Sequence, residues 1–115
     1  MIEITIRNYL LSQNLSVGQN IFLETPENPP EEYVLIEKTG SGRTDHINRA
    51  MMAIKSISKK SMYRAASINE EVISAMDNSI YAEELFKCEL NSDYNFTDDT
   101  KKQYRYQAVY NITHY

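Results

Sequence analysis

The chain has 115 residues, a usual size for one domain, and 42% of them are apolar. Its net charge of -4 and its scattered Lys and Arg residues argue against a nucleic-acid-binding protein, because such proteins usually carry a basic surface. With 3 Gly and 3 Pro but 9 Tyr, the composition also excludes low-complexity and collagen-like sequences.

The cysteine count and the apolar runs bear on the compartment. Cys88 is the single cysteine, so no internal disulfide can form, which favours assembly in the cytoplasm. Glu3 and Asn8 interrupt the N-terminal segment, and we expect no signal peptide there. No apolar run approaches the roughly 18 residues that a membrane span requires. We therefore expect no membrane association.

The first expected element is a helix over residues 2–13. Ile2, Ile6 and Leu10 recur at helical spacing and would form one apolar stripe. The β-branched run at residues 4–6 could instead begin a strand.

The next segments change to a period of two residues. Residues 20–25 alternate as a strand would, and residues 26–32 contain all three prolines, which predicts a loop. An apolar run at residues 33–38 predicts another strand. It is followed at residues 39–42 by two glycines, which can supply the positive φ angles of a tight connection. We expect both the 26–32 loop and a loop at 39–45 to be mobile in an isolated subunit.

Residues 47–57 predict a long strand that is apolar on both faces. Such a strand must be covered on both sides, by the chain's own helices or by a neighbouring subunit. The two expected faces are Ile47, Met51, Ala53 and Ile57 on one side, and Ala50, Met52 and Ile54 on the other.

The clearest expected helix covers residues 61–76. Ser61 is well placed to be its N-cap. Its apolar stripe is expected to pack on the sheet and consists of Met62, Ala65, Ala66, Asn69, Val72, Ile73 and Met76.

The C-terminal part predicts two further strands, at residues 85–90 and 103–112, with a turn at 91–93. The last strand alternates regularly, and one face carries Tyr104, Tyr106, Ala108, Tyr110 and Ile112. The element order α-β-β-β-α-β-β predicts an α+β fold of one domain over residues 1–115. Its two helices would pack on one face of an antiparallel or mixed sheet.

Three patterns could indicate chemistry, and each is better explained by structure. The glycines of residues 40–43 lack the spacing and the Lys of a phosphate loop, so a connecting turn is favoured. His46 and His114 are the only imidazoles, and with one distant cysteine they show no metal-ligand spacing. The acidic cluster of Asp93, Asp98 and Asp99 lacks the alternating ligands and distal Glu of a calcium loop. We therefore assign no catalytic, cofactor or metal residue.

Several segments, taken in order, resemble the tail-completion proteins of siphophages and prophages, which include the lambda-like tail terminators. The segments are residues 29–40 (PPEEYVLIEKTG), 53–56 (AIKS), 62–66 (MYRAA), 94–98 (YNFTD) and 105–108 (RYQA). The resemblance implies an α+β protein that forms a hexameric ring in the neck of the virion. It also implies a role in stopping growth of the tail tube, with the tail tube protein and the head-completion or connector protein as partners. It implies no enzymatic activity.

A ring requires contacts in which one surface patch meets a different patch on the next copy. Around the strand at residues 47–57, charged residues flank an apolar centre, as at the rim of an interface. The candidate interface residues are Arg49, Met51, Ala53, Lys55, Gly40, Gly42 and Arg43.

Two other functions stay open at this point. One is an enzyme of unknown type centred on His46 and Asp45. The other is a nucleic-acid-binding adaptor that uses Tyr104, Tyr106 and Arg105 of the last strand, since aromatic side chains on a sheet can stack on bases. The acidic composition disfavours the adaptor, and tyrosines at alternate positions are more often core or interface residues.

Overall fold

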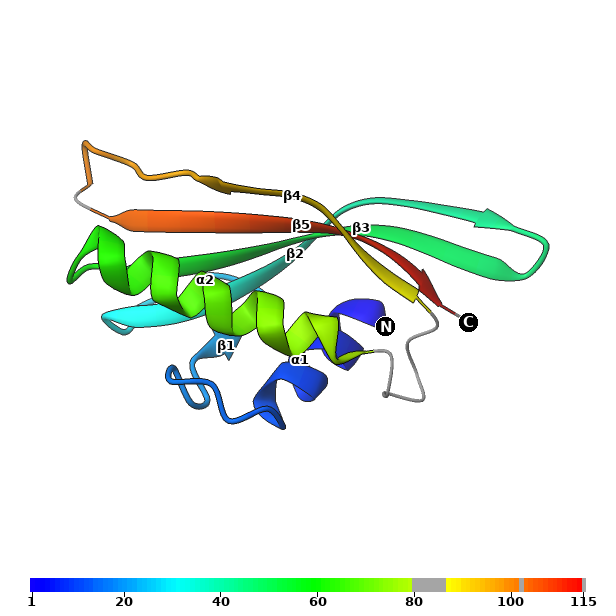
Figure 1. Ribbon diagram of the computed structural model, residues 1–115, viewed down its shortest axis with the longest axis horizontal. Helices are drawn as coiled ribbons and strands as arrows, with labels where there is room; N and C mark the ends of the chain where they lie inside the picture. The colour runs from blue at the N-terminus through cyan, green and yellow to red at the C-terminus, as the bar shows by residue number, and fades with distance from the viewer. Residues whose placement is uncertain (80–86, 102, 115) are drawn as a thin grey trace.

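The computed structural model describes residues 1–79, 87–101 and 103–114. Its elements follow one another as α1 (Ile2–Leu11), β1 (Ile21–Phe22), β2 (Glu32–Thr44), β3 (Ile47–Ser58), α2 (Met62–Asp77), β4 (Lys87–Asn95) and β5 (Tyr104–His114). The expected order α-β-β-β-α-β-β is confirmed (Figure 1).

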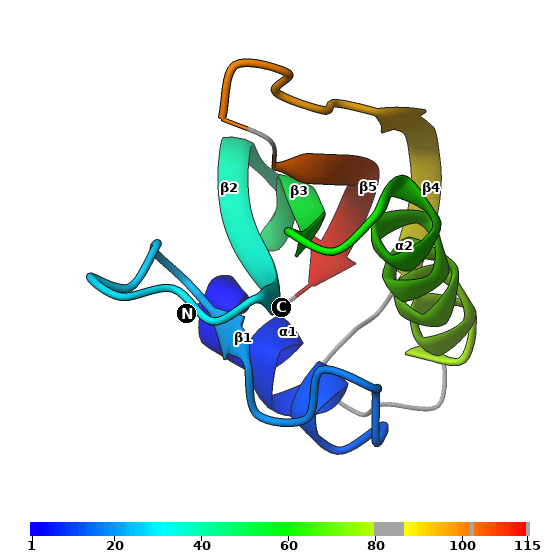
Figure 2. The same ribbon diagram turned by 90° about the vertical axis from the view of Figure 1, so that its left-hand side faces the viewer.

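The strands form one sheet in the order β1-β2-β3-β5-β4. β1 runs parallel to β2, and the remaining neighbours are antiparallel, so the sheet is mixed. Both helices lie on the same face of this sheet, while the connection from β4 to β5 arches over the opposite side (Figure 2). We call these the helix face and the open face of the sheet.

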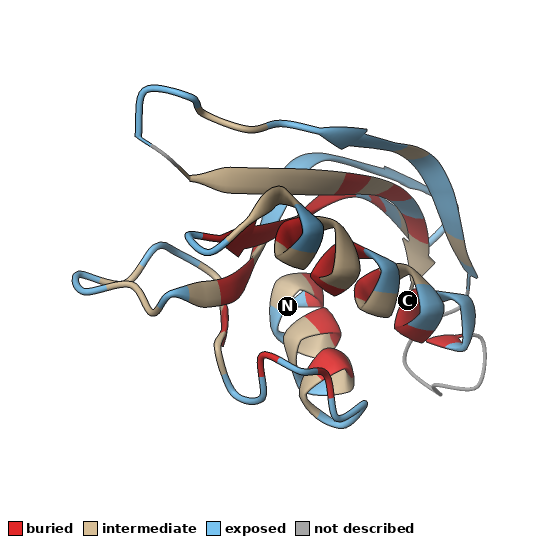
Figure 3. Ribbon diagram, turned by 60° about the vertical axis from the view of Figure 1, so that its left-hand side comes forward, coloured by how far each residue is buried: buried red, intermediate tan, exposed pale blue. Residues whose placement is uncertain are grey.

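Both helices form where the apolar spacing predicts them. In α1, Ile2, Ile6 and Leu10 are buried, which confirms a helix rather than a strand at this position. α2 begins after Ser61, whose side-chain oxygen accepts a hydrogen bond from the backbone N–H of Arg64 at 3.1 Å. Figure 3 shows the buried residues recurring along both helices at the spacing of one apolar stripe.

β3 is the centre of the sheet because it is paired along both edges. It pairs with β2 from Glu32↔Ser58 to Thr44↔Ile47, and with β5 from Ser58↔Tyr104 to Asn48↔His114. On the helix face its side chains enter the main core with α2 and β5; the β3 members of that core are Ala50, Met52 and Ile54. The predicted alternation of the last strand is confirmed as well, with Ala108, Tyr110 and Ile112 in the same core.

The glycine-rich segment 39–42 does not end a strand, contrary to the prediction. β2 continues to Thr44, with an irregularity in register between Lys38 and Gly40. Gly40 and Gly42 do not use positive φ angles, since Gly18 is the glycine that does. Pairing with the long β3 strand outweighs the local preference of glycine for turns, so the expected loop at 39–45 is one arm of a hairpin.

Two other strand boundaries differ from the expected ones. The strand expected over residues 20–25 contains only Ile21–Phe22. The turn expected at 91–93 lies inside β4, which absorbs it as an irregularity in register between Leu90 and Ser92. The expected strand at 85–90 is found from Lys87, and residues 85 and 86 lie outside the described residues.

Glu32 ties three elements together on the helix side. Its carboxylate, at the start of β2, accepts hydrogen bonds from Arg64 of α2 at 2.9 and 3.1 Å and from Ser58 of β3 at 3.1 Å. The hydrogen bonds from Arg64 lower the pKa of Glu32, against the opposing effect of burial. This contact sets the position of the first turn of α2 on the sheet.

The burial of α2 gives a direct test of the fold. Val72 is fully buried in the main core, so Val72→Asp would place a carboxylate there without a partner. We expect it to lower the free energy of unfolding by about 3 kcal/mol or more, measured by urea denaturation. Ser74→Asp, on the exposed side of the same helix, is the control and should cost less than about 1 kcal/mol. Equal stability of the two variants would contradict this packing.

Candidate assembly surface

The far half of the β2–β3 hairpin extends beyond the helices, and we call residues 38–51 the arm. Every residue of β2 from Glu37 to Thr44 is exposed, although all of them except Thr39 are paired with β3 in the register of the hairpin. Figure 1 shows the arm projecting from the body at the end away from the start of α2. Beyond Leu35, where the pairing with β1 ends, no described strand pairs with the outer edge of β2.

The tip of the arm is a two-residue turn in an unusual backbone conformation. Asp45 and His46 have φ angles of 51° and 69°, between the paired residues Thr44 and Ile47. Positive φ at both central positions is typical of a type I′ turn, which usually contains Asn-Gly. Here the two positions are Asp-His, with no glycine to mark the turn, and the left-handed region costs a residue with a side chain roughly 1–2 kcal/mol.

The register irregularity at Lys38/Gly40 decides which way the two glycines face. It pairs Gly40 with Met51 and Gly42 with Arg49, so all four positions lie on the open face. A Cβ on Gly40 would meet Met51 at an ordinary 3.9 Å, and one on Gly42 would meet nothing within 4 Å. Neither position therefore requires glycine within this chain.

The absence of these two side chains leaves a shallow depression of about 280 Å³ on the open face of the arm. Met51 borders it with a side chain that is 39% exposed. The depression extends across β3 to the end of β5, where Asn111 and Thr113 line it. A smooth backbone surface beside an exposed apolar side chain is suited to close approach by another polypeptide.

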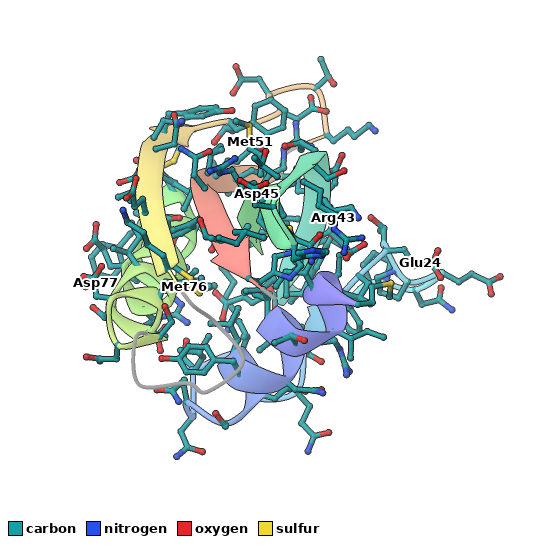
Figure 4. All side chains as sticks on the ribbon, turned by 90° about the vertical axis from the view of Figure 1, so that its right-hand side faces the viewer. Glu24, Arg43, Asp45, Met51, Met76 and Asp77 are labelled. Atoms are coloured by element: carbon teal, nitrogen blue, oxygen red, sulfur yellow. The ribbon has the colours of Figure 1, made fainter. Side chains whose placement is uncertain are left out.

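The structure brings together some of the candidate interface residues and separates others. Gly40, Gly42, Arg49 and Met51 gather on the arm's open face, and Arg43 belongs to the helix-face side because it pairs with Asn48. Figure 4 looks along the molecule from this end and shows Met51 and Arg43 on different sides of the arm.

Ala53 and Lys55 lie further along β3, in the body of the sheet. Ala53 is only 1% exposed, so its side chain is not available to a partner, which corrects that part of the expected interface. The Lys55 ammonium forms an ion pair with Glu37 at 2.8 Å. These two residues therefore belong to the structure of the open face rather than to the arm.

The body half of the open face is covered by the chain itself. After β4, the ring of Phe96 lies 4.4 Å from the Arg105 guanidinium and 5.8 Å from the Lys55 ammonium, measured to the ring centroid. Tyr94 packs edge-on against Phe96 at 6.3 Å between centroids. Beside this cluster Ile57 is almost completely buried. The sequence did not predict that Phe96 and Tyr94 cover the open face. Phe96 lies after the end of β4, where no pattern in the sequence indicates its position.

The tyrosine row of β5 does not form an open platform for bases. Tyr110 is buried in the main core, and burial raises the pKa of its hydroxyl. Tyr104 and Tyr106 pair with residues on the helix face, whereas Arg105 lies on the open face with its guanidinium over Phe96. The three residues expected to act together in an adaptor thus lie on two sides of the sheet.

The structure does not place Asp45 and His46, the expected centre of an enzyme, beside other potentially catalytic side chains among the described residues. Asp45 and His46 stand at the exposed tip of the arm. Asp93 accepts a hydrogen bond from Asn69, and Asp98 accepts one from Thr100, which lowers the pKa of Asp98. Among the described residues no group of three or more His, Cys, Asp or Glu could hold a metal ion.

No helix within the described residues is long and apolar enough to cross a membrane.

Comparison with known proteins shows a likeness in fold. No protein-family model matches the chain, and no curated protein sequence does. Among solved structures, a chain from the virion of a native gene transfer agent particle superposes with a TM-score of 0.70 at 13% sequence identity. The match covers 94% of this chain and 92% of the other. The two chains share their fold over nearly their whole lengths.

The strained tip of the arm can be tested alone. His46→Gly should raise the free energy of unfolding by about 0.5–1 kcal/mol, because glycine adopts φ near 69° without a steric penalty. His46→Val, with a β-branched side chain, should lower it. Urea denaturation of both variants at a concentration where the protein is monomeric measures the difference. If valine is tolerated as well as glycine, the turn does not have this conformation.

Proposed function

We propose that this chain is a structural protein of a tailed-phage-type particle. In that particle it would form a hexameric ring that caps the head-proximal end of the tail tube and takes part in head–tail joining. Its partners would be further copies of itself, the tail tube protein and the head-completion or connector protein. Its place would be the neck of the virion, after assembly in the host cytoplasm.

The likeness in fold to a virion chain carries this proposal. It extends over 94% of this chain and 92% of the other, so it is not limited to a common sheet motif. The sequence segments that resemble tail-completion proteins point to the same class of protein independently of the fold. At 13% identity the likeness carries the fold, and the ring and its place at the end of the tail are our inference.

The arm is the surface best suited to joining copies in such a ring. It offers an unpaired strand edge, a glycine-lined depression and an exposed apolar residue on one projecting element. Exposed strand edges readily accept another chain. If the arm of one copy binds a different surface of the next copy, the two copies are joined head to tail. Head-to-tail contacts close into rings when the rotation between copies allows it.

Two neighbouring methionines of β3 test the surface. Met51 is exposed on the open face, whereas Met52 is completely buried in the main core. Met51→Lys should leave the subunit folded and weaken assembly at least about tenfold, since it places a charge in the contact. Met52→Lys should unfold the subunit, at a cost of about 3 kcal/mol or more. Native mass spectrometry and circular dichroism on both variants measure the two effects.

The same experiment decides between the proposal and the nucleic-acid adaptor. The wild-type protein should give a species of six times the 13.4 kDa of one chain. If the wild type stays monomeric at every concentration and binds single-stranded DNA in low salt, the adaptor replaces the ring. If Met51→Lys keeps the wild-type mass, the open face of the arm is not the contact between copies.

A further inference from the structure

The arm has an excess of positive charge that the chain does not neutralise. Residues 38–51 contain Lys38, Arg43 and Arg49 against one acid, Asp45. None of the three cations takes part in an ion pair within the described residues. All three line a depression of about 450 Å³ that also includes Met1, Ile2 and Glu3 at the start of α1, and Glu3 contributes one carboxylate to it. In a chain of net charge -4, this is a local basic surface.

A second depression carries the opposite charge. Along α2, residues 65–78 contain Glu70, Glu71 and Asp77 and no Lys or Arg. Between this part of α2 and the segment after α1 lies a depression of about 430 Å³, with Glu70 and Glu71 in its lining and Leu15 and Ala75 as apolar contacts. Glu71 accepts a 2.8 Å hydrogen bond from the backbone N–H of Ser16, which connects α2 to the segment after α1 at this depression. Glu70 is exposed and has no ion pair in the described part of the chain.

From this complementarity we propose that the arm is covered on both sides in the assembly: besides the contact on the open face around Met51, its other side, which carries Arg43, binds the acidic depression of α2 on the next copy, with Arg43 meeting Glu70. The proposal rests on the ring proposed above and names the two different patches that such a ring needs. The two patches cannot meet within one chain, because Arg43 and the C-terminal end of α2, marked by Asp77, lie on opposite sides of the molecule (Figure 4). The contact is therefore between copies, and it is heterologous.

The loop before β2 is the competing acidic surface. It carries Glu24, Glu27 and Glu31, but Lys59 lies beside it, with its backbone N–H donating to the carbonyl oxygen of Glu31 at 3.0 Å. Lys60 approaches the neighbouring Glu32 within 3.9 Å. The α2 surface stands on a helix and has no cation in residues 65–78. Arg64, just before that range, forms an ion pair with Glu32 at 2.9 Å, so Glu70 has no such partner among the described residues and the α2 surface is the better ordered of the two.

Charge reversal at the two positions tests the contact. Arg43→Glu and Glu70→Lys each place like charges opposite one another, so each should raise the dissociation constant of the assembly by about tenfold or more. The double variant restores an opposite pair and should return to within about threefold of the wild type. Glu27→Lys, in the competing loop, is the matched control and should assemble as the wild type does. Sedimentation velocity over a range of protein concentrations gives the constants, and circular dichroism verifies that each exposed-site variant is folded.

The outcomes separate this contact from the ring itself. If the wild type forms a ring but the double variant assembles no better than the singles, the ring stands and the Arg43–Glu70 contact is wrong. If Glu27→Lys disrupts assembly and Glu70→Lys does not, the arm binds the loop before β2 instead of α2, which also overturns the contact. If the wild type does not assemble at any concentration, the proposed ring fails and this contact with it.

Discussion

The pairing of β3 along both of its edges is the constraint on which the rest of the structure depends. This strand is apolar on both faces, so each face must be removed from water. The helix face obtains its cover from α1 and α2, and that requirement places both helices on one side of the sheet. On the open face, the connection after β4 brings Phe96 over Arg105 and Lys55, and Ile57 is buried beside them. The cover of the open face does not extend to Met51, which is 39% exposed.

The arm follows from the same pairing. β2 stays paired with β3 up to Thr44, the last residue before the turn, although the helices end well before that point. The hydrogen-bonded hairpin can hold Asp45 and His46 at positive φ, a conformation that isolated residues of these types would rarely keep. A projecting, ordered element with an unpaired edge and uncompensated positive charge has little to contribute to the stability of one chain. Its features become useful when a second chain covers it.

The sequence predicted the elements whose signals are local. The α2 helix, the Ser61 cap and the alternation of β5 each depend on side chains a few residues apart, and each is found where expected. The buried stripe of α2 differs in part: it also contains Ile68 and Ala75, while Met62, Ala66 and Ile73 are only partly buried. The glycines at 40 and 42 misled the prediction because their pairing with Met51 and Arg49 of β3 outweighs their preference for turns. The turn at Asp45 and His46 lacked the glycine that normally marks it.

The candidate surface was predicted only in part, because its arrangement depends on pairing between segments and not on local spacing. The candidate residues around Met51 are exposed, but the face of each one depends on the register irregularity after Lys38, which no pattern in the sequence indicates. Ala53 was expected at the surface because it alternates with Met51, and it is buried since the chain covers that half of the open face. The cover by Phe96 depends on contacts between segments far apart in the chain. The acidic depression of α2 was not anticipated, although the run of acids in residues 65–78 without a base was a usable signal.

Amide hydrogen exchange at two protein concentrations tests the arm-mediated assembly most directly. In a dilute solution of monomers, the outward amides of residues 36–44 should exchange fast, because they form an unpaired strand edge on a protruding element. At a concentration where the protein is assembled, we expect exchange in this segment and along the exposed side of α2 to slow by about tenfold or more. Residues 52–58 of β3, which are paired on both edges, should not change. An increase in particle mass without any change in the exchange of the arm would contradict the account.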